Sequence, residues 1–277
     1  MSRLLITGGS SYLGQHLVPQ ALAGHEVVYT YFSHDPWGWP QGRRLDLRDG
    51  VAVQALVAET RPEIILHLAG SNRGGVVMAE VICQGAAHVA RAATATQARL
   101  IHLSTDVIFD GQHAPYREED PPAPLHEYGR AKAEAERLVQ AHANHVIVRT
   151  SLVYGLTRPD HGTAWVMAAL GAGQPVTLFT DELRNPIWAD SLSRACLELA
   201  GLDYRGVLHV AGAPCLSRAA FGLKLLDYWG VTARATLQLG RTDPTRRPQN
   251  CCLDTGRAQR LLQTPLPGVD EVLSRPG

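Results

Sequence analysis

The chain has 277 residues, which suits one large domain or two small ones, and its 45% hydrophobic content is that of a folded globular protein. Lysine and arginine total 26, as do aspartate and glutamate, so the net charge at pH 7 is zero. A balanced charge argues against a general electrostatic grip on nucleic acid or on anionic lipid. We therefore expect the binding partner to be a small molecule or another protein.

The cysteines and the N-terminal residues bear on the cellular compartment. The five cysteines are an odd number and form no C-x-x-C pair, so neither a disulfide framework nor a metal site is predicted. Cys251 and Cys252 could form a redox pair, but neutral thiols in a reducing compartment are the favoured interpretation. No apolar run resembles a signal peptide or is long enough to span a membrane. The sequence thus predicts a soluble, cytoplasmic protein.

Short apolar or β-branched runs alternate with longer helical stretches along the first half of the chain. This alternation predicts an α/β fold, a Rossmann-type doubly wound parallel sheet with helices on both faces. Residues 1–150, rejoined by about 187–211, would form a dinucleotide-binding domain, and the remaining segments of 151–277 a smaller C-terminal substrate lobe. The predicted strands cover residues 4–7, 26–32, 63–68, 100–105, 145–150 and 206–210, and the predicted helices cover residues 13–22, 51–59, 76–95, 127–143, 163–172, 189–202 and 217–229.

Prolines mark two further features. Pro19 lies inside the first predicted helix, so a kink or a late helical turn is expected there. The segment 114–124 holds four prolines and an acidic run. We interpret it as a solvated loop, with a lid over a site as the alternative.

A glycine-rich turn, TGGSSYLG, follows the first strand and opens the first helix. Gly8 would allow the sharp turn, and Gly14 would allow the helix to pack closely on the sheet. Backbone N–H groups between them, at the positive end of the helix, can receive a pyrophosphate. The turn therefore predicts a bound dinucleotide, with a purely structural turn as the alternative.

The end of the second predicted strand bears on which dinucleotide binds. A carboxylate there would hold the ribose 2′-hydroxyl and favour NAD, but the first acid is Asp35, beyond the strand. Without an acid to repel a 2′-phosphate, NADP is the preferred cofactor and NAD remains possible. The side chains nearby that could hold the phosphate are Ser33, His34, Arg43 and Arg44.

Tyr128 and Lys132 are four residues apart at the start of a predicted helix, so their side chains share one face. A lysine ammonium and an oxidised nicotinamide would lower the phenol pKa from about 10 and bring proton transfer closer to neutral pH. On its own such a spacing is often a surface pair. Ser104 and Thr105 strengthen the prediction, because their hydroxyls are expected at the carboxyl edge of the sheet, the usual ligand crevice.

Six segments occur in the order typical of a known family: ITGGSSYLG (6–14), DLRD (46–49), PEIILHLAG (62–70), LSTDVIFDG (103–111), YGRAK (128–132) and VRTSLVYG (148–155). Together they resemble the extended short-chain dehydrogenase/reductases, specifically the dTDP-4-dehydrorhamnose reductase-like branch. Later segments at 181–190, 206–212 and 247–262 are similar to that branch too. The resemblance covers nearly the whole chain.

The resemblance implies a reductase that passes hydride from a nicotinamide to the keto carbon of a nucleotide-linked sugar. Tyr128 would donate the proton, Thr105 would hold the carbonyl oxygen, and Lys132 would bind the nicotinamide ribose and tune Tyr128. The implied cofactor residues, besides Tyr128 and Lys132, are Gly8, Ser10, Ser11, Tyr12, Leu13, Gly14, Tyr31, Ser33, Asp46, Leu47, Leu68, Ala69, Gly70 and Ser104. The implied substrate residues are Thr105, Val107, Tyr154, Arg184 and Trp188.

A function of a different class remains open. A non-catalytic NADP-binding subunit, like the regulatory subunit of methionine adenosyltransferase in the same branch, would share the cofactor cleft. The presence of Thr105, Tyr128 and Lys132 together favours catalysis, because a binding subunit has no need of all three. We expect a monomer or a homodimer.

Overall fold

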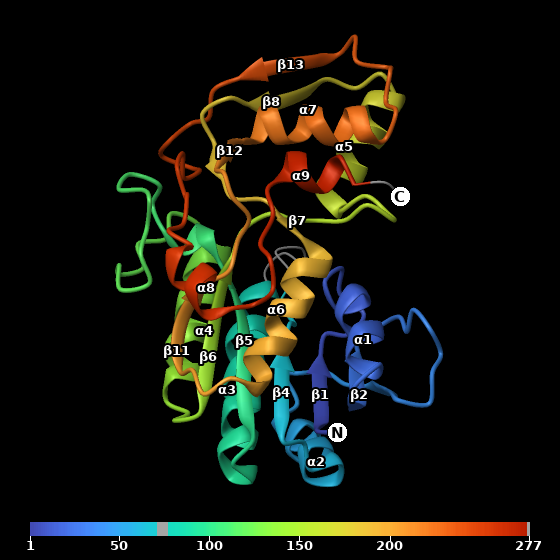
Figure 1. Ribbon diagram of the computed structural model, residues 1–277, viewed down its shortest axis with the longest axis vertical. Helices are drawn as coiled ribbons and strands as arrows, with labels where there is room; N and C mark the ends of the chain where they lie inside the picture. Colours follow the sequence, from blue (N-terminus) through green and yellow to red (C-terminus); the bar gives the residue numbers. More distant parts are fainter. Residues whose placement is uncertain (71–76, 276–277) are drawn as a thin grey trace.

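A seven-stranded parallel sheet with helices on both faces forms the larger part of the molecule (Figure 1). The computed structural model describes residues 1–70 and 77–275. Across the sheet the strands lie in the order β11 (Gly206–His209), β6 (His145–Thr150), β5 (Arg99–Thr105), β4 (Ile64–His67), β1 (Arg3–Thr7), β2 (Glu26–Tyr31) and β3 (Gly42–Arg44). The chain runs outward one way from β1 to β3 and the other way from β4 to β11. The predicted doubly wound α/β fold of the Rossmann type is therefore confirmed.

Both faces of this sheet are buried, which is why its strands read as continuous apolar runs. Leu4 and Ile6 of β1 pack in the cluster that contains α1 and α6, and Leu5 points to the opposite cluster with α2, α3 and α4. The helices of the first face are α1 (Gly14–Leu22) and α6 (Ala189–Gly201), and those of the second are α2 (Gly50–Thr60), α3 (Val77–Thr96) and α4 (Glu127–Gln140).

A smaller lobe lies beyond the carboxyl ends of the strands, at the top of Figure 1. It contains three helices and three two-stranded sheets. The helices are α5 (His161–Gly171), α7 (Arg218–Tyr228) and α9 (Val269–Leu273). The paired strands are β8 (Val176–Phe179) with β13 (Leu237–Gly240), β9 (Leu183–Arg184) with β12 (Leu216–Ser217), and β7 (Val153–Tyr154) with β10 (Ile187–Trp188). A further helix, α8 (Gly256–Leu261), packs beside β11.

The predicted strands and helices all occur, most of them within a residue or two of their expected bounds. The predicted start of the third helix at Val76 lies outside the described residues. Helix α4 ends at Gln140, three residues before the predicted end, and Pro19 lies in the last turn of α1, as expected of a proline inside that helix. None of the helices within residues 1–70 and 77–275 is both long and apolar enough to cross a membrane.

The proline-rich segment 114–124 is an exposed loop held down at two residues. Tyr116 is buried, and its ring stacks on Phe109 with centroids 4.0 Å apart. Glu118 is also buried and accepts a hydrogen bond from the His209 N–H at 3.2 Å. The loop is therefore fixed against the β11 edge of the sheet.

Candidate functional site

A cleft of about 1060 Å³ lies at the carboxyl ends of the central strands, between the sheet and the smaller lobe. We call its two walls the sheet side and the lobe side. The sheet side comprises Gly8, Ser10, Ser11, Tyr12, Leu13, Thr30, Tyr31, Phe32, Leu45, Asp46, Leu47, Arg48, Leu68, Ala69 and Gly70. The lobe side comprises Asp160, Gly162, Thr163, Val166, Leu178, Glu182, Arg184, Arg218, Phe221, Gly222, Leu226, Arg247 and Pro248. No residue of the loop 114–124 lines this cleft, so the structure does not make that loop a lid over it.

The glycine turn after β1 accepts no larger residue at its two ends. Gly8 has a φ of +77°, and a Cβ there would lie 2.8 Å from the Ala69 nitrogen. A Cβ on Gly14 would lie 2.4 Å from the Gly9 carbonyl oxygen. The turn therefore exposes backbone without side chains to the cleft. Helix α1 begins directly after it, so the positive end of the helix points toward the cleft. Gly14 itself packs behind that wall.

The end of β2 presents no free carboxylate to the cleft among the described residues. Asp35 accepts hydrogen bonds from the Tyr29 hydroxyl at 2.8 Å and from the Trp37 N–H at 3.1 Å, which keep its pKa low despite partial burial. Ser33, His34, Arg43 and Arg44 do not line the cleft. The cation on this wall is Arg48, whose Nη2 donates to Asp46 at 2.6 Å.

Thr105 and Tyr128 meet at the centre of the cleft. Helix α4 starts with the His126 ring accepting a hydrogen bond from the Gly129 N–H at 3.0 Å. A Cβ on Gly129 would lie 2.4 Å from the Val107 carbonyl oxygen, so glycine lets the helix start pack against the end of β5. Thr105 and Tyr128 both line the cleft, and the Thr105 hydroxyl is near enough to the phenol to lower its pKa.

The pKa of Tyr128 is raised to about 12, in the direction opposite to the one predicted. Burial is the largest cause, and the negative charge of Asp106 adds to it, whereas the hydrogen bond with Thr105 acts the other way. Lys132 is not among the groups that shift the phenol pKa, and its amine is bonded to the Leu103 carbonyl oxygen instead. The expected lowering of the phenol pKa by Lys132 is therefore corrected.

Lys132 lies behind the wall of the cleft. Its side chain is buried, and its Nζ donates to the Leu103 carbonyl oxygen at 2.5 Å and lies 3.4 Å from His102 Nε2. Burial lowers its pKa to about 8, and the charge of Glu136 opposes this shift. Gly70, with a φ of +125°, lies beside the amine: a Cβ there would lie 3.7 Å from Nζ.

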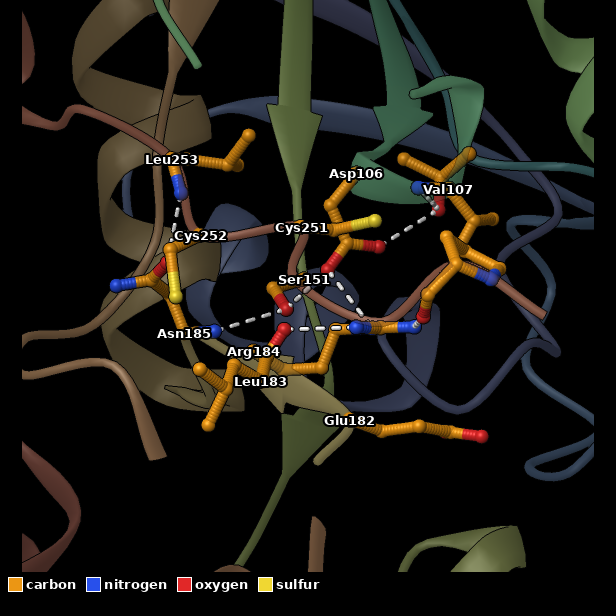
Figure 2. Close-up of polar contacts among 12 residues, drawn as sticks. Asp106, Val107, Ser151, Glu182, Leu183, Arg184, Asn185, Cys251, Cys252 and Leu253 are labelled. Carbon is orange, nitrogen blue, oxygen red and sulfur yellow. Dashed lines mark hydrogen bonds and ion pairs between the residues drawn. The ribbon is translucent and has the colours of Figure 1, made fainter. Parts of the chain in front are cut away.

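Asp106 follows Thr105 in η1 (Asp106–Ile108) and forms a buried polar cluster that the sequence did not predict (Figure 2). It accepts a hydrogen bond from the Ser151 hydroxyl at 2.5 Å and lies 3.7 Å from Arg184 Nε. Burial raises its pKa, and the positive charge of Arg184 opposes the shift. Arg184 is oriented by three further bonds, from Nη1 to the carbonyls of its neighbours Leu183 and Gln249 and from Nη2 to Pro248.

Three guanidinium groups line the lobe side, around the buried carboxylate of Glu182. Arg247 binds it with Nη2 3.0 Å from Oε2, and Arg218 Nε lies 3.7 Å from the same oxygen. Thr242 donates a further hydrogen bond to it at 3.0 Å. Arg184, the third guanidinium, is held by Asp106 and by backbone. Glu182 thus forms ion pairs with Arg218, at the start of α7, and with Arg247, in the segment before Cys251.

A disulfide joins the segment that carries Arg218 to the segment that carries Arg247. Cys215 precedes β12 and is bonded to Cys252, five residues after Arg247. The prediction that Cys252 is a neutral thiol is therefore wrong. The two bonded cysteines are 37 residues apart, so no short cysteine spacing in the sequence indicates the bond. Cys251 is a free, buried thiol with its pKa raised by burial, as predicted for a neutral thiol.

Several residues expected at the site lie elsewhere. Side chains alternate along β5, so Ser104 faces away from the cleft and donates to buried Glu136, contrary to the expected crevice position. Tyr154 is fully buried, and its ring packs against Phe221 with centroids 5.5 Å apart. Trp188 lies outside the cleft under the guanidinium of Arg275. The structure therefore places Tyr154 and Trp188 in the packing of the smaller lobe.

The structure brings most of the other expected residues together and adds some that the sequence reading missed. The expected residues on the cleft wall are Gly8, Ser10, Ser11, Tyr12, Leu13, Tyr31, Asp46, Leu47, Leu68, Ala69, Gly70, Thr105, Val107, Tyr128 and Arg184. The added ones with titratable or nucleophilic side chains include Arg48, Asp106, His126, Glu127, Ser151, Asp160, His161, Glu182, Arg218 and Arg247. Asp106 could have been inferred from its position next to Thr105, and Glu182 and Arg247 lie in later segments that resemble the family, whereas Arg218 had no such signal.

Comparison with known proteins places this architecture in a family. The model of the RmlD substrate binding domain matches residues 2–275. The probable low-salt glycan biosynthesis reductase Agl14 of Haloferax volcanii is 29% identical over 97% of this chain and 95% of its own. The dTDP-4-dehydrorhamnose reductase of Streptomyces griseus is 32% identical over 95% of this chain and 89% of its own.

A solved structure supports the same grouping. The dTDP-4-dehydrorhamnose reductase of Bacillus anthracis, in complex with NADP, superimposes with a TM-score of 0.81 at 25% identity over 99% of this chain and 98% of its own. The seven-stranded doubly wound sheet, the glycine turn and a family match spanning nearly the whole chain agree. The chain belongs to the RmlD substrate binding domain family, within the extended short-chain dehydrogenase/reductases.

Proposed function

We propose that the protein is an NADP-dependent reductase of a keto group on a nucleotide-linked sugar, similar to dTDP-4-dehydrorhamnose reductase. The observation that carries this proposal is that the hydroxyls of Thr105 and Tyr128 line the same cleft as the glycine turn and the arginines of the lobe side. Residues 1–150, rejoined by 187–211, would bind the dinucleotide, and the remaining segments of 151–277 would bind the sugar nucleotide.

The sheet side suits a dinucleotide. Its bare backbone at Gly8 and the start of α1 would receive the pyrophosphate, Asp46 and Leu47 would flank the adenine, and Gly70 would lie beside the nicotinamide ribose. The dinucleotide supplies hydride when it is bound. Lys132, whose amine lies next to Gly70, would bind the ribose hydroxyls.

Tyr128 would donate the proton that the reduced carbonyl oxygen requires, and Thr105 would hold that oxygen by a hydrogen bond. A phenol whose pKa is about 12 keeps its proton at neutral pH, so it is in the form needed for donation. An alkoxide developing within hydrogen-bond distance is a strong enough base to take that proton. Asp106, one residue beyond Thr105, favours the protonated phenol through its negative charge.

NADP is the proposed cofactor rather than NAD. Asp35 is engaged by Tyr29 and Trp37, so no carboxylate among the described residues at the end of β2 would repel a 2′-phosphate. Arg48 on the same wall, with its side chain 36% exposed, is bonded to Asp46 through Nε and Nη2, so its Nη1 would donate to that phosphate.

The lobe side suits the diphosphate of a sugar nucleotide. Arg218 and Arg247 each present a guanidinium at the cleft wall while sharing the single carboxylate of Glu182. Two cations on one anion leave a positive charge for a ligand phosphate, and guanidinium groups bind phosphate oxygens in a fork geometry.

The direct test is NADPH oxidation, followed by absorbance, with dTDP-4-dehydrorhamnose and with other 4-keto nucleotide sugars. We expect turnover with at least one of them and none with NADPH alone. Tight NADPH binding without oxidation by any of these sugars would instead support the non-catalytic regulatory subunit.

A further inference from the structure

A buried histidine lies beside Lys132 and has no part in the reaction as described so far. His102 on β5 is fully buried, and its Nε2 lies 3.4 Å from Lys132 Nζ. The same Nζ donates to the Leu103 carbonyl oxygen at 2.5 Å. The amine of Lys132 is thus held between an imidazole nitrogen and a backbone oxygen of one strand.

The titratable groups around His102 and the amine of Lys132 come from three elements besides β5. His67 of β4 lies opposite it in the strand register, with ring centroids 5.1 Å apart. Lys132 and Glu136 come from α4, and Cys83 from α3 faces the same amine. Burial and the positive charge of Lys132 hold the pKa of His102 well below its usual range, so its ring is neutral.

A neutral imidazole has one protonated and one acceptor nitrogen. Because Lys132 can only donate, the nitrogen facing it must be the acceptor, which puts the proton of His102 on Nδ1. Nδ1 is buried and has no hydrogen-bond partner among the described residues. The protonated Nδ1 of His102 is therefore buried without a hydrogen bond, whereas Nε2 accepts one from Lys132.

An ammonium group has three N–H donors, and two of them are used by Leu103 and His102. The third is left for a ligand. Gly70 lines the cleft beside the amine, and a Cβ there would lie 3.7 Å from Nζ, so the glycine leaves the space next to the amine open. Fixing two donors in this way determines the direction of the third.

We propose that His102 is a positioning residue for Lys132: it accepts one N–H of the ammonium, stabilises the charged form and leaves one N–H for the ribose of the dinucleotide. The inference rests on the proposed function, because it assumes that Lys132 binds the dinucleotide.

Replacement of His102 by leucine removes the acceptor and leaves the ammonium buried with one bond fewer. A cation that loses a stabilising partner has a lower pKa, so the amine of Lys132 loses its proton at a lower pH than in the wild type. Binding that needs the ammonium is then lost at lower pH. The alkaline limb of the pH dependence, of NADPH affinity and of kcat/KM, should move toward acid by about one pH unit in His102→Leu. His102→Asn, whose amide oxygen can accept from Lys132, should recover part of that shift.

The experiment measures the NADPH Kd between pH 6 and 10 for the wild type, His102→Leu, His102→Asn and the matched control His142→Leu. His142 is another buried imidazole, bonded to Thr94 and to the Ala98 carbonyl away from the cleft. We expect NADPH to bind His102→Leu about tenfold more weakly at pH 8, His102→Asn to bind at an intermediate level, and His142→Leu to keep the wild-type profile. Equal shifts in His142→Leu and His102→Leu, or an unmoved limb in His102→Leu, would overturn the proposal.

A measurement on the wild type keeps the proposal testable if the leucine variant does not fold. The ¹⁵N chemical shifts of His102 at neutral pH should show an unprotonated Nε2 and a protonated Nδ1, and the opposite tautomer would overturn the proposal. Failure of the proposed function looks different. If Lys132→Met binds NADPH as the wild type does, the assumed role of Lys132 is wrong, whereas binding lost in Lys132→Met and retained in His102→Leu rejects the inference alone.

Discussion

The two walls of the cleft are built by different means. On the sheet side, short stretches at the ends of neighbouring strands are held by backbone geometry, as at Gly8, where bare backbone lies against Ala69. On the lobe side, side chains from distant segments are held by each other. Glu182 binds Arg247, which is 65 residues away, and a disulfide closes the segment from 215 to 252.

The difference indicates how each wall can vary. A wall of backbone keeps its shape when side chains change, which suits the dinucleotide proposed for the sheet side. The ligand preference of a wall built from ion pairs depends on its side chains, so a substitution there alters which ligand binds. The two walls should therefore respond separately to mutation. The two lobe-side experiments below measure both NADPH affinity, for the sheet side, and the sugar-nucleotide KM, for the lobe side.

The largest effect is expected from Cys252→Ser. Opening a loop of 37 residues restores chain entropy to the unfolded state, which corresponds to a loss of roughly 4 kcal/mol in the free energy of unfolding. Urea denaturation measures it. The sugar-nucleotide KM should rise as the segments carrying Arg218 and Arg247 separate, while NADPH affinity stays close to that of the wild type.

The double variant Cys215→Ser/Cys252→Ser is the control for this prediction. The single variants Cys252→Ser and Cys215→Ser and the double variant all lose the same disulfide bond. The double variant should therefore be no less stable than the less stable of the two single variants. Additive losses, or a fall in NADPH affinity equal to that in sugar-nucleotide affinity, would show that the disulfide does not act on the lobe side in particular.

Arg218→Ala should produce the next largest effect. It removes a guanidinium from the lobe side and leaves Glu182 with Arg247, so the fold should survive. Loss of one charge-assisted contact to a phosphate should raise the sugar-nucleotide KM by about tenfold or more, with little change in kcat or in NADPH affinity. Steady-state kinetics with both substrates measures this. Arg246→Ala, which removes an exposed arginine outside the cleft, should change neither constant.

The smallest effect is expected at the sheet side from Phe32→Asp. Phe32 lies at the end of β2 and lines the cleft with 53% of its surface exposed. A carboxylate there should repel a 2′-phosphate and accept a bond from a 2′-hydroxyl, so the ratio of NADPH to NADH affinity should fall by about tenfold. The neutral variant Phe32→Asn separates charge from loss of the ring. A ratio that is unchanged, or that falls equally in both variants, contradicts this account of cofactor choice.

The same contrast explains what the sequence could predict. Alternating apolar strands and amphipathic helices, punctuated by glycine and proline, are local signals, and they predicted the main sheet and its helices. The glycine turn is local too, because Gly8 and Gly14 act on their own neighbours. Thr105 and Tyr128 were predicted to lie together because a strand end and a helix start each carry one of them.

The lobe side could not be predicted in the same way. Its strands are two to four residues long, too short for a periodic pattern, and β9 pairs with β12 more than 30 residues later. Arg218 and Arg247 approach Glu182 only after that pairing. Burial also reversed one electrostatic expectation: together with the charge of Asp106 it raises the pKa of Tyr128, and neither effect can be inferred from the spacing of Tyr128 and Lys132.

The central claim is that Tyr128 donates a proton in this cleft while the sheet side binds the dinucleotide independently. Tyr128→Phe removes one oxygen atom and leaves the ring, so it tests both halves at once. In single-turnover oxidation of bound NADPH by dTDP-4-dehydrorhamnose, the account predicts a rate about 10²–10⁴ times lower than in the wild type, with NADPH affinity unchanged. A wild-type rate in Tyr128→Phe would contradict it.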